Sequence, residues 1–203
     1  LISWNPDQWI NSFQSSECKN FKPTKKNILV KHHLRSNVNR NIVHSILADL
    51  QNIRPGNISF SCGIHGKPYL PPEFGMKFNV SHSDRISILC ATKKSMELGI
   101  DIELIRKFED PLAIAKFMLH KDEADFLYEE YSKTDHPEFT KLFLKVWTFK
   151  EAFIKGLGLS MASDSKNHSI LAHIVDSANT RDWAFVEPEI DEAYQCSYAY
   201  KWH

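Results

Sequence analysis

The chain has 203 residues and carries 25 Lys and Arg side chains against 25 Asp and Glu side chains, so its formal net charge is zero. Without a basic excess it has no general field to hold a nucleic acid, and we expect no nucleic-acid partner. Apolar residues at 42% and aromatic residues at 12% are typical of a folded globular chain. Apolar runs such as residues 88–91 are far shorter than the ~20 residues that cross a bilayer, so we expect no membrane span.

The cysteines lie far apart in the sequence and form no CxxC pair. This spacing predicts reduced, buried thiols in a cytoplasmic protein rather than a zinc or disulfide site. The four residues are Cys18, Cys62, Cys90 and Cys196. The first residue is Leu1 instead of Met, and we therefore expect the sequence to be part of a longer chain.

Hydrophobic periodicity divides the first half of the sequence into one helix and several strands. Residues 25–50 predict a helix, because apolar side chains recur at steps of four from Val30 to Leu50. The period then changes to two, which predicts strands separated by Pro- and Gly-rich turns. These strands are expected over residues 58–64, 76–80, 86–91 and 100–104.

The second half begins with helices. Asp110 followed by Pro111 predicts a helix start, with an acceptor side chain at the cap and Pro in the first turn. Further helices are expected from Lys121 and from Asp135, the latter ending at Gly156 to Gly158. Three strands are then expected over residues 170–175, 183–186 and 194–200. Strands and helices run in blocks, which favours an α+β fold over a doubly wound parallel sheet.

Two acids lie within one of the predicted strands. Ile100, Ile102 and Leu104 alternate with Asp101 and Glu103, so if the apolar residues are buried, both carboxylates point to the other side. Their Cα atoms would be about 6.6 Å apart, which lets both side chains reach one hard cation such as Mg²⁺. The alternative for this pair alone is a solvated acidic strand face.

The long helix ending near residue 156 carries a second polar group. Trp147, Glu151 and Lys155 lie on one stripe at 100° per residue, while Lys150 lies at the edge of the apolar arc. A lysine in that position is costly unless its ammonium group reaches water or an anion. The alternative for Glu151 and Lys155 is an ordinary surface ion pair at i, i+4.

A third group of polar residues follows the predicted strand at 76–80. Ser81, His82 and Ser83 offer hydroxyl, imidazole and backbone N–H donors to phosphate oxygens. Neighbouring strand residues point to opposite faces, so Ser81 and His82 do not form a nucleophile–base pair. The turn Gly66-Lys67-Pro68 adds a cation on a restricted backbone.

The order and spacing of four motifs resemble the Sfp-type 4'-phosphopantetheinyl transferases. The motifs are Gly66-Lys67-Pro68, Phe78-Asn79-Val80-Ser81-His82-Ser83, Gly99-Ile100-Asp101-Ile102-Glu103 and Trp147-Thr148-Phe149-Lys150-Glu151-Ala152-Phe153-Ile154-Lys155-Gly156. The flanks look like the eukaryotic L-aminoadipate-semialdehyde dehydrogenase phosphopantetheinyl transferase type. These flanking residues are Trp4-Asn5-Pro6, Trp9, Asp182-Trp183-Ala184-Phe185 and Ile190-Asp191-Glu192.

The resemblance implies transfer of the 4'-phosphopantetheine arm from coenzyme A to a serine of an apo carrier protein, with Mg²⁺ as cofactor and release of adenosine 3',5'-bisphosphate. It also implies two similar α/β halves with the active site in the cleft between them, and a monomer. The N-terminal half would cover residues 1–96 and bind the 3'-phosphate and adenine of coenzyme A. The C-terminal half, residues 97–203, would carry the metal and catalytic residues.

Carried over by position, the resemblance implies that Asp101, Glu103 and Glu151 bind Mg²⁺. Glu151 would also accept the serine proton, and Lys155 with Lys150 would stabilise the charge that develops on the bridging and leaving oxygens.

The same comparison implies the contacts to coenzyme A. His82 would contact the pyrophosphate, and Ser81 with Lys67, which precedes Pro68, would contact the 3'-phosphate. Either Arg35 or Lys31 would supply a further cation to that phosphate. Asp84 stands where the family usually has a small residue.

Two alternatives to the transferase remain at the level of sequence. One is a relative that binds coenzyme A or a carrier protein without turnover. The other is a metal-dependent nuclease built on Asp101, Glu103, Glu151 and Lys155, which a chain without a basic face disfavours.

Overall fold

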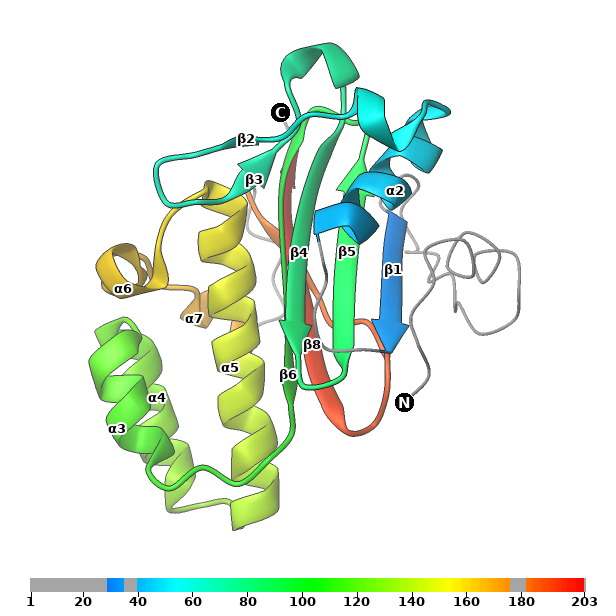
Figure 1. Cartoon of the computed structure of the whole chain (residues 1–203). Coiled ribbons are helices and arrows are strands. Elements are labelled where there is room, and N and C mark those ends of the chain that lie inside the picture. The colour runs from blue at the N-terminus through cyan, green and yellow to red at the C-terminus, as the bar shows by residue number, and fades with distance from the viewer. Residues whose placement is uncertain (1–28, 35–39, 176–181, 203) are drawn as a thin grey trace.

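The computed structural model describes residues 29–34, 40–175 and 182–202, whose strands form two three-stranded sheets and a short hairpin (Figure 1). All pairings within the sheets are antiparallel. The first sheet has the order β1 (Leu29–Leu34), β5 (Ile86–Thr92), β4 (Lys77–Ser83). The second has the order β6 (Met96–Leu104), β8 (Tyr194–Trp202), β7 (Ala184–Val186). The hairpin pairs β2 (Ser61–Cys62) with β3 (Pro68–Tyr69).

The helices lie on the outer sides of these sheets. They are α2 (Arg40–Gln51), α3 (Pro111–Met118), α4 (Lys121–Tyr131), α5 (His136–Leu157), α6 (Met161–Asp164) and α7 (Leu171–Val175). Short 3₁₀ turns cover Pro55–Asn57, Pro72–Phe74 and Ser165–Asn167. Mixed helices and antiparallel sheets confirm the α+β expectation. Among the described residues, no helix combines the length and apolar character that a bilayer crossing requires.

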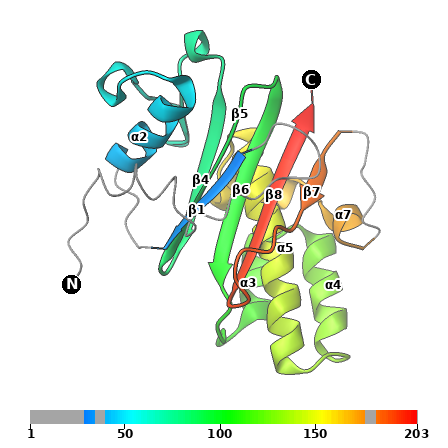
Figure 2. The ribbon, with the colours of Figure 1, turned by 90° about the vertical axis from the view of Figure 1, so that its right-hand side faces the viewer.

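The two sheets pack against each other, and each has one main helix on its outer face (Figure 2). Alternate side chains of β5, among them Ile86 and Ile88, meet Ile100 and Ile102 of β6 in a shared core. The other face of the first sheet is covered by α2, and the other face of the second by α5. Because β5 is buried on both faces, its sequence is a continuous run of buried residues.

The ends of the long helix α5 are set by local sequence. Asp135 caps its start by accepting a hydrogen bond from the backbone N–H of Glu138 at 2.9 Å. Gly158 ends it with a φ of 75°, a left-handed conformation that glycine adopts without strain. Asp110 caps α3 in the same way through the N–H of Ala113. These boundaries confirm the sequence prediction.

The prediction of one helix over residues 25–50 is wrong in its first part. Leu29–Leu34 is strand β1, paired with β5, and only Arg40–Gln51 is helical. Residues four apart share a face in a strand as well as in a helix, so the step from Val30 to Leu34 fits both. Residues 29–34 form a strand because pairing with β5 satisfies backbone hydrogen-bonding groups of both strands.

Two other strand predictions need correction. Residues 171–175 form helix α7 instead of a strand, and Ile170, just before the helix, and Ile174 within it are both buried. The predicted strand over residues 58–64 is reduced to Ser61–Cys62. Cys62 is exposed, contrary to the expectation of buried thiols, whereas Cys90 and Cys196 are buried and free. Cys18 lies outside the described residues.

Candidate functional site

The two sheets meet along a seam, defined here as the contact between β4 and β6, that is held by side chains. Asn79 accepts a hydrogen bond from the backbone N–H of Ile100 at 2.9 Å, and the Ser83 hydroxyl accepts one from Leu104 at 3.0 Å. With Ser81, these residues occupy every second position of β4 and so share one side of the strand. Side chains of β4 therefore fix the neighbouring strand β6.

The two acids predicted on β6 are both held across this seam. Ser81 donates to Oδ1 of Asp101 at 2.7 Å, and Ser83 donates to Oε2 of Glu103 at 2.8 Å. Asp101 is only 2% exposed, while Glu103 is half-buried. A solvated acidic strand face is therefore wrong for Asp101.

Helix α5 reaches the seam because its backbone packs directly on β6 at a glycine. A Cβ atom at Gly99 would lie 1.9 Å from the carbonyl oxygen of Ala152 and 2.4 Å from the nitrogen of Gly156. Gly156 has as little room, since its own Cβ would lie 2.7 Å from the Trp183 ring. Only a residue without a side chain at these positions lets the helix approach so closely.

This close approach brings the polar stripe of α5 to the acids of the seam. The Lys155 ammonium lies 2.5 Å from Oδ1 of Asp101 and 3.2 Å from Oε2 of Glu151. It also donates to the Ser81 hydroxyl at 3.2 Å. Glu151 and Lys155 thus belong to a cluster between helix and strand, and the alternative of an isolated surface pair is wrong. Their side chains keep partial access to solvent, at 20% and 28%.

Burial and charge shift the pKa values within this cluster. Burial raises the pKa of Asp101 to about 7, with Glu151 adding to the increase and Lys155 opposing it. Burial alone would lower the pKa of Lys155, but the two carboxylates raise it above its ordinary value. The site therefore holds a stable cation beside a carboxyl group whose pKa is raised.

One oxygen of this cluster has no partner among the described residues. Oδ2 of Asp101 is buried without a hydrogen bond, and a buried oxygen in this state calls for a cation or a donor. A divalent ion beside Asp101 and Glu151 fits this observation, since oxygen ligands are what Mg²⁺ takes. Glu103 is turned toward Ser83, and no group of three His, Cys, Asp or Glu side chains within the described ranges is already arranged around one point.

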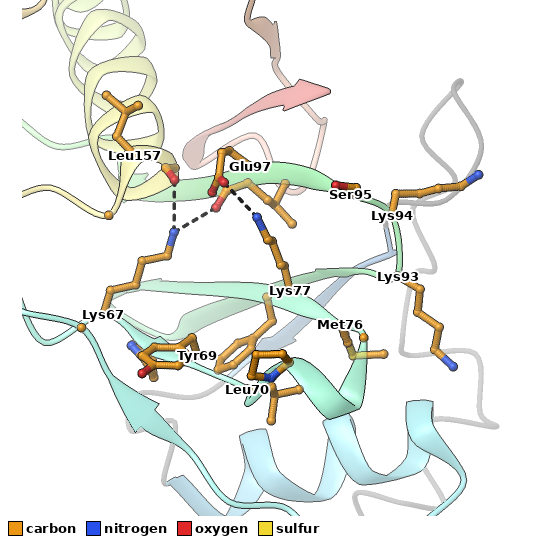
Figure 3. Close-up of a pocket in the computed structure, with 18 residues that line it drawn as sticks. Lys67, Tyr69, Leu70, Met76, Lys77, Lys93, Lys94, Ser95, Glu97 and Leu157 are labelled. Atoms are coloured by element: carbon orange, nitrogen blue, oxygen red, sulfur yellow. Dashed lines mark hydrogen bonds and ion pairs between the residues drawn. The ribbon is translucent and has the colours of Figure 1, made fainter. Parts of the chain in front are cut away.

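A cavity of about 610 Å³ opens beside the C-terminal end of α5 (Figure 3). Tyr69, Leu70 and Met76 form an apolar wall on one side, Phe78 also lines the cavity, and lysines lie around it. These lysines are Lys67, Lys77, Lys93 and Lys94. Such a pocket suits a ligand with a flat or apolar body and a negative group.

Lys67 connects this cavity to helix α5. Its ammonium donates to the carbonyl oxygens of Leu98 at 3.3 Å and Gly156 at 3.4 Å, and also to that of Lys155. A cation at a helix C-terminus meets the free carbonyl groups and the negative end of the helix dipole. Burial lowers the pKa of Lys67, with Glu97 opposing the shift.

Comparison with known proteins identifies the family to which this arrangement belongs. The family model of the 4'-phosphopantetheinyl transferase superfamily matches residues 97–201, which begin within β6 and end within β8. The chain belongs to the 4'-phosphopantetheinyl transferase superfamily. The matched segment contains Asp101 and Glu103 of β6 and the whole of α5.

Individual relatives agree with this assignment. The 4'-phosphopantetheinyl transferase HetI of Nostoc sp. is 34% identical over 64% of this chain and 54% of its own length. The 4'-phosphopantetheinyl transferase gsp of Aneurinibacillus migulanus is 31% identical over 83% of this chain and 69% of its own length. The mouse L-aminoadipate-semialdehyde dehydrogenase-phosphopantetheinyl transferase is 24% identical over 94% of this chain and 69% of its own length. The chain thus spans between about half and two thirds of these transferases.

Lys150 is the predicted site residue of the transferase motif that the structure does not bring to the acids. Its ammonium lies 2.8 Å from the carboxylate of Glu123, and both side chains are 0% exposed. It also donates to the carbonyl oxygen of His168. The anion that a lysine at the edge of the apolar arc requires is therefore supplied by helix α4. The expected contact of Lys150 with coenzyme A stays a prediction.

The other described residues that the transferase resemblance assigns to coenzyme A lie on different strands of the structure. His82 is exposed on β4 next to Ser81, and Pro68 lines the cavity. Lys31 lies on β1, which is separated from β4 by β5. Arg35 lies outside the described residues, as do Trp4-Asn5-Pro6 and Trp9.

Asp84, the departure from the family pattern, is explained by the turn between β4 and β5. It has a φ of 48°, in the left-handed region where a small residue is usual and Asp is tolerated. Its carboxylate accepts hydrogen bonds from Arg85 at 3.2 Å and from the Tyr194 hydroxyl at 3.1 Å. These partners hold the charge at the exposed turn.

The sequence pattern assigned no role to Asn79, gave Ser83 only as a donor to phosphate oxygens, and did not indicate Glu123. The period-two spacing of Asn79, Ser81 and Ser83 on a strand would have predicted a common polar side. No local pattern points to Glu123, because its partner Lys150 lies 27 residues away on another helix.

Proposed function

We propose that the chain transfers 4'-phosphopantetheine from coenzyme A to a serine hydroxyl of an apo carrier protein, and releases adenosine 3',5'-bisphosphate. The observation that carries this proposal is the cluster of Asp101, Glu151 and Lys155 within the segment that matches the family. Phosphoryl transfer needs positioning and charge neutralisation more than covalent chemistry, and a cluster of acids and a lysine provides both.

Mg²⁺ is the proposed cofactor, held by Asp101 and Glu151, with Glu103 turning from Ser83 to join them. Support comes from the unpartnered Oδ2 of Asp101 and from the low exposure of that carboxyl group. When bound, the ion would neutralise the negative charge of the pyrophosphate.

Glu151 and Lys155 have complementary roles in this proposal. Glu151 retains access to solvent, which lets its carboxylate accept the proton of the attacking serine, directly or through water. Lys155 stays protonated because its pKa is raised, so it stabilises negative charge on the oxygens of the transferred group. His82, exposed on the same strand as Ser81, would contact the pyrophosphate.

The cavity beside Lys67 is the proposed site for the nucleoside end of coenzyme A. Its apolar wall would accept the adenine ring, and its lysine rim would accept the 3'-phosphate. Ser81 is bonded to Asp101 and Lys155, which favours the pyrophosphate over the 3'-phosphate as its partner. Lys31 and Arg35 remain candidates for a further cation.

The arrangement of the halves is also part of the proposal. We infer a pseudo-dimer with halves 1–96 and 97–203, because each sheet has one main helix on its outer face and β6 begins at Met96. The active site would lie in a cleft at the seam between them. A cytoplasmic monomer is the expected state.

A transfer assay tests the proposal. The chain is incubated with an apo carrier protein, coenzyme A and Mg²⁺, and the carrier is weighed by mass spectrometry. We expect a gain of one phosphopantetheine group that EDTA prevents and added Mg²⁺ restores. No gain with several carriers, while coenzyme A still binds by calorimetry, would show a non-catalytic relative instead.

A further inference from the structure

The pair formed by Lys150 and Glu123 is sealed inside the molecule. Both side chains are 0% exposed, and the Lys150 ammonium lies 2.8 Å from each of the two carboxylate oxygens. Burial lowers the pKa of Lys150, and Glu123 opposes that shift. Removing two charges from water costs free energy even when they pair, so this buried pair points to a role other than stabilising the fold.

Backbone groups from two further segments of the chain complete this pair. Glu123 accepts hydrogen bonds from the N–H groups of His120 at 3.1 Å and Ile170 at 2.6 Å. Lys150 donates to the carbonyl oxygen of His168. The buried clasp, meaning Lys150 and Glu123 with these backbone bonds, therefore fastens α5 to the start of α4 and to the segment before α7.

The clasp lies on α5 directly beside the catalytic stripe. Lys150 precedes Glu151 by one residue and Lys155 by five, so it points about 100–140° away from them around the helix axis. Side-chain ends lie about 5–6 Å from a helix axis, and a rotation of about 10° therefore moves them by about 1 Å. A displacement of that size at a reacting group costs up to about 10²-fold in rate.

On the opposite side, α5 is held against β6 by the close contact at Gly99. That contact fixes the distance between helix and strand. The clasp supplies a second, directional attachment that resists rotation, because its hydrogen bonds have defined geometry.

We propose that Lys150 is a positioning residue: through the buried clasp with Glu123 it sets the rotation of α5 and hence the placement of Glu151 and Lys155. This inference rests on the proposed transfer reaction. It assigns Lys150 to the interior of the protein instead of to the pyrophosphate of coenzyme A.

The proposal predicts that a second substitution will rescue the Lys150 variant. Lys150→Met leaves the Glu123 carboxylate buried and unpaired, which is far worse for the local structure than removing both charges. Glu123→Gln combined with Lys150→Met removes both charges and keeps a carbonyl oxygen for the Ile170 N–H. A residue that binds coenzyme A directly could not be rescued in this way.

The test is steady-state kinetics of phosphopantetheine transfer, together with melting temperatures, for wild type, K150M and E123Q/K150M. We expect K150M to lower kcat by about 10–100-fold with the KM for coenzyme A changed by less than about twofold. The double variant should recover most of the lost kcat and melting temperature. The matched control is Lys145→Met on the same helix, whose ion pair with Glu187 is partly exposed and whose loss should leave kcat unchanged.

The results that would contradict this proposal differ from those that would contradict the proposed function. A KM for coenzyme A raised about tenfold in K150M, and still raised in the double variant, would show direct contact with the substrate and overturn the proposal. A wild-type chain without transfer would overturn the proposed function, and the catalytic role of the clasp with it. Melting temperatures that fall in K150M and recover in the double variant would then still support the clasp as a structural attachment.

Discussion

Helix α5 carries two lysines, five residues apart, that pair with carboxylates in opposite surroundings. Lys150 and Glu123 are fully buried, and backbone groups complete their hydrogen bonds. Lys155 is 28% exposed, and its partner Asp101 keeps one oxygen unpartnered. A saturated pair has no capacity left for a ligand, whereas an incomplete pair that reaches solvent can receive one. The same residue types thus serve attachment in one place and chemistry in the other.

The largest expected effect comes from removing the acid of the incomplete pair. Asp101→Asn should lower the transfer rate by about 10³-fold or more, because the charge that would hold the metal and balance Lys155 is lost. Folding should not suffer, since the raised pKa of Asp101 shows that its ionised form is disfavoured in the folded state. Transfer assays and chemical denaturation at pH 8 measure the two effects. Loss of activity with equal loss of stability would contradict this division of roles.

The stabilities of two lysine variants test the difference between the buried pair and the incomplete pair. Lys150→Met should lower the free energy of unfolding by about 3–5 kcal/mol, because it strands a buried carboxylate. Lys155→Met should lower it by about 1 kcal/mol or less, since its surroundings are partly exposed and Asp101 can protonate. Urea denaturation of both variants gives the values. Equal losses would show that the two pairs contribute equally to the free energy of unfolding.

The close contact at Gly99 offers a further test, because it places α5 against the incomplete pair. Gly99→Ala should lower the free energy of unfolding by about 3 kcal/mol, the upper end for overpacking, as the added Cβ meets backbone atoms that cannot move aside. Transfer should fall as well, because the helix must shift away from Asp101. Gly56→Ala is the control, since a Cβ there meets nothing within 4 Å. Similar melting temperatures for both alanine variants would contradict the expectation.

Features set by local sequence could be predicted, while those set by distant partners could not. The caps of α3 and α5 follow from Asp110, Asp135 and Gly158, which act within one turn of the chain. The first strand was read as helix because steps of four fit both, and only its pairing with β5 decides.

The candidate site shows the same division. Spacing predicted residues 101 and 103 on one side of a strand and residues 151 and 155 on one stripe of a helix, while their common role was implied by the family resemblance. The structure brings residues 101, 151 and 155 together. The partner of the Lys150 ammonium group depends on whether the nearest anion belongs to a ligand or to α4. That choice is made by tertiary packing, and the sequence pattern only states that an anion is required.

The pH dependence of stability also distinguishes the incomplete pair. The pKa of Asp101 is about 7 in the folded chain and its ordinary value is 3.8, so between pH 4 and pH 7 the folded state binds more protons than the unfolded state. The free energy of unfolding of wild type should therefore fall as pH rises through this window, relative to Asp101→Asn, by up to about 1.4 kcal/mol per pH unit. Denaturation curves of both proteins at several pH values measure it. A constant difference between them would rule out the raised pKa.

The smallest expected effect concerns the hydroxyl group that holds Glu103 at the seam. Ser83 donates to that carboxylate and accepts from the N–H of Leu104, so Ser83→Ala should cost about 1 kcal/mol of stability through the unpaired backbone group. The variant should also change the Mg²⁺ concentration at half-maximal transfer, because Glu103 loses the partner that orients it. Ser83→Thr keeps the hydroxyl and should resemble wild type in both measurements. If alanine and threonine variants behave alike, Glu103 is oriented by something other than the seam, and the incomplete pair of Asp101 and Lys155 works without it.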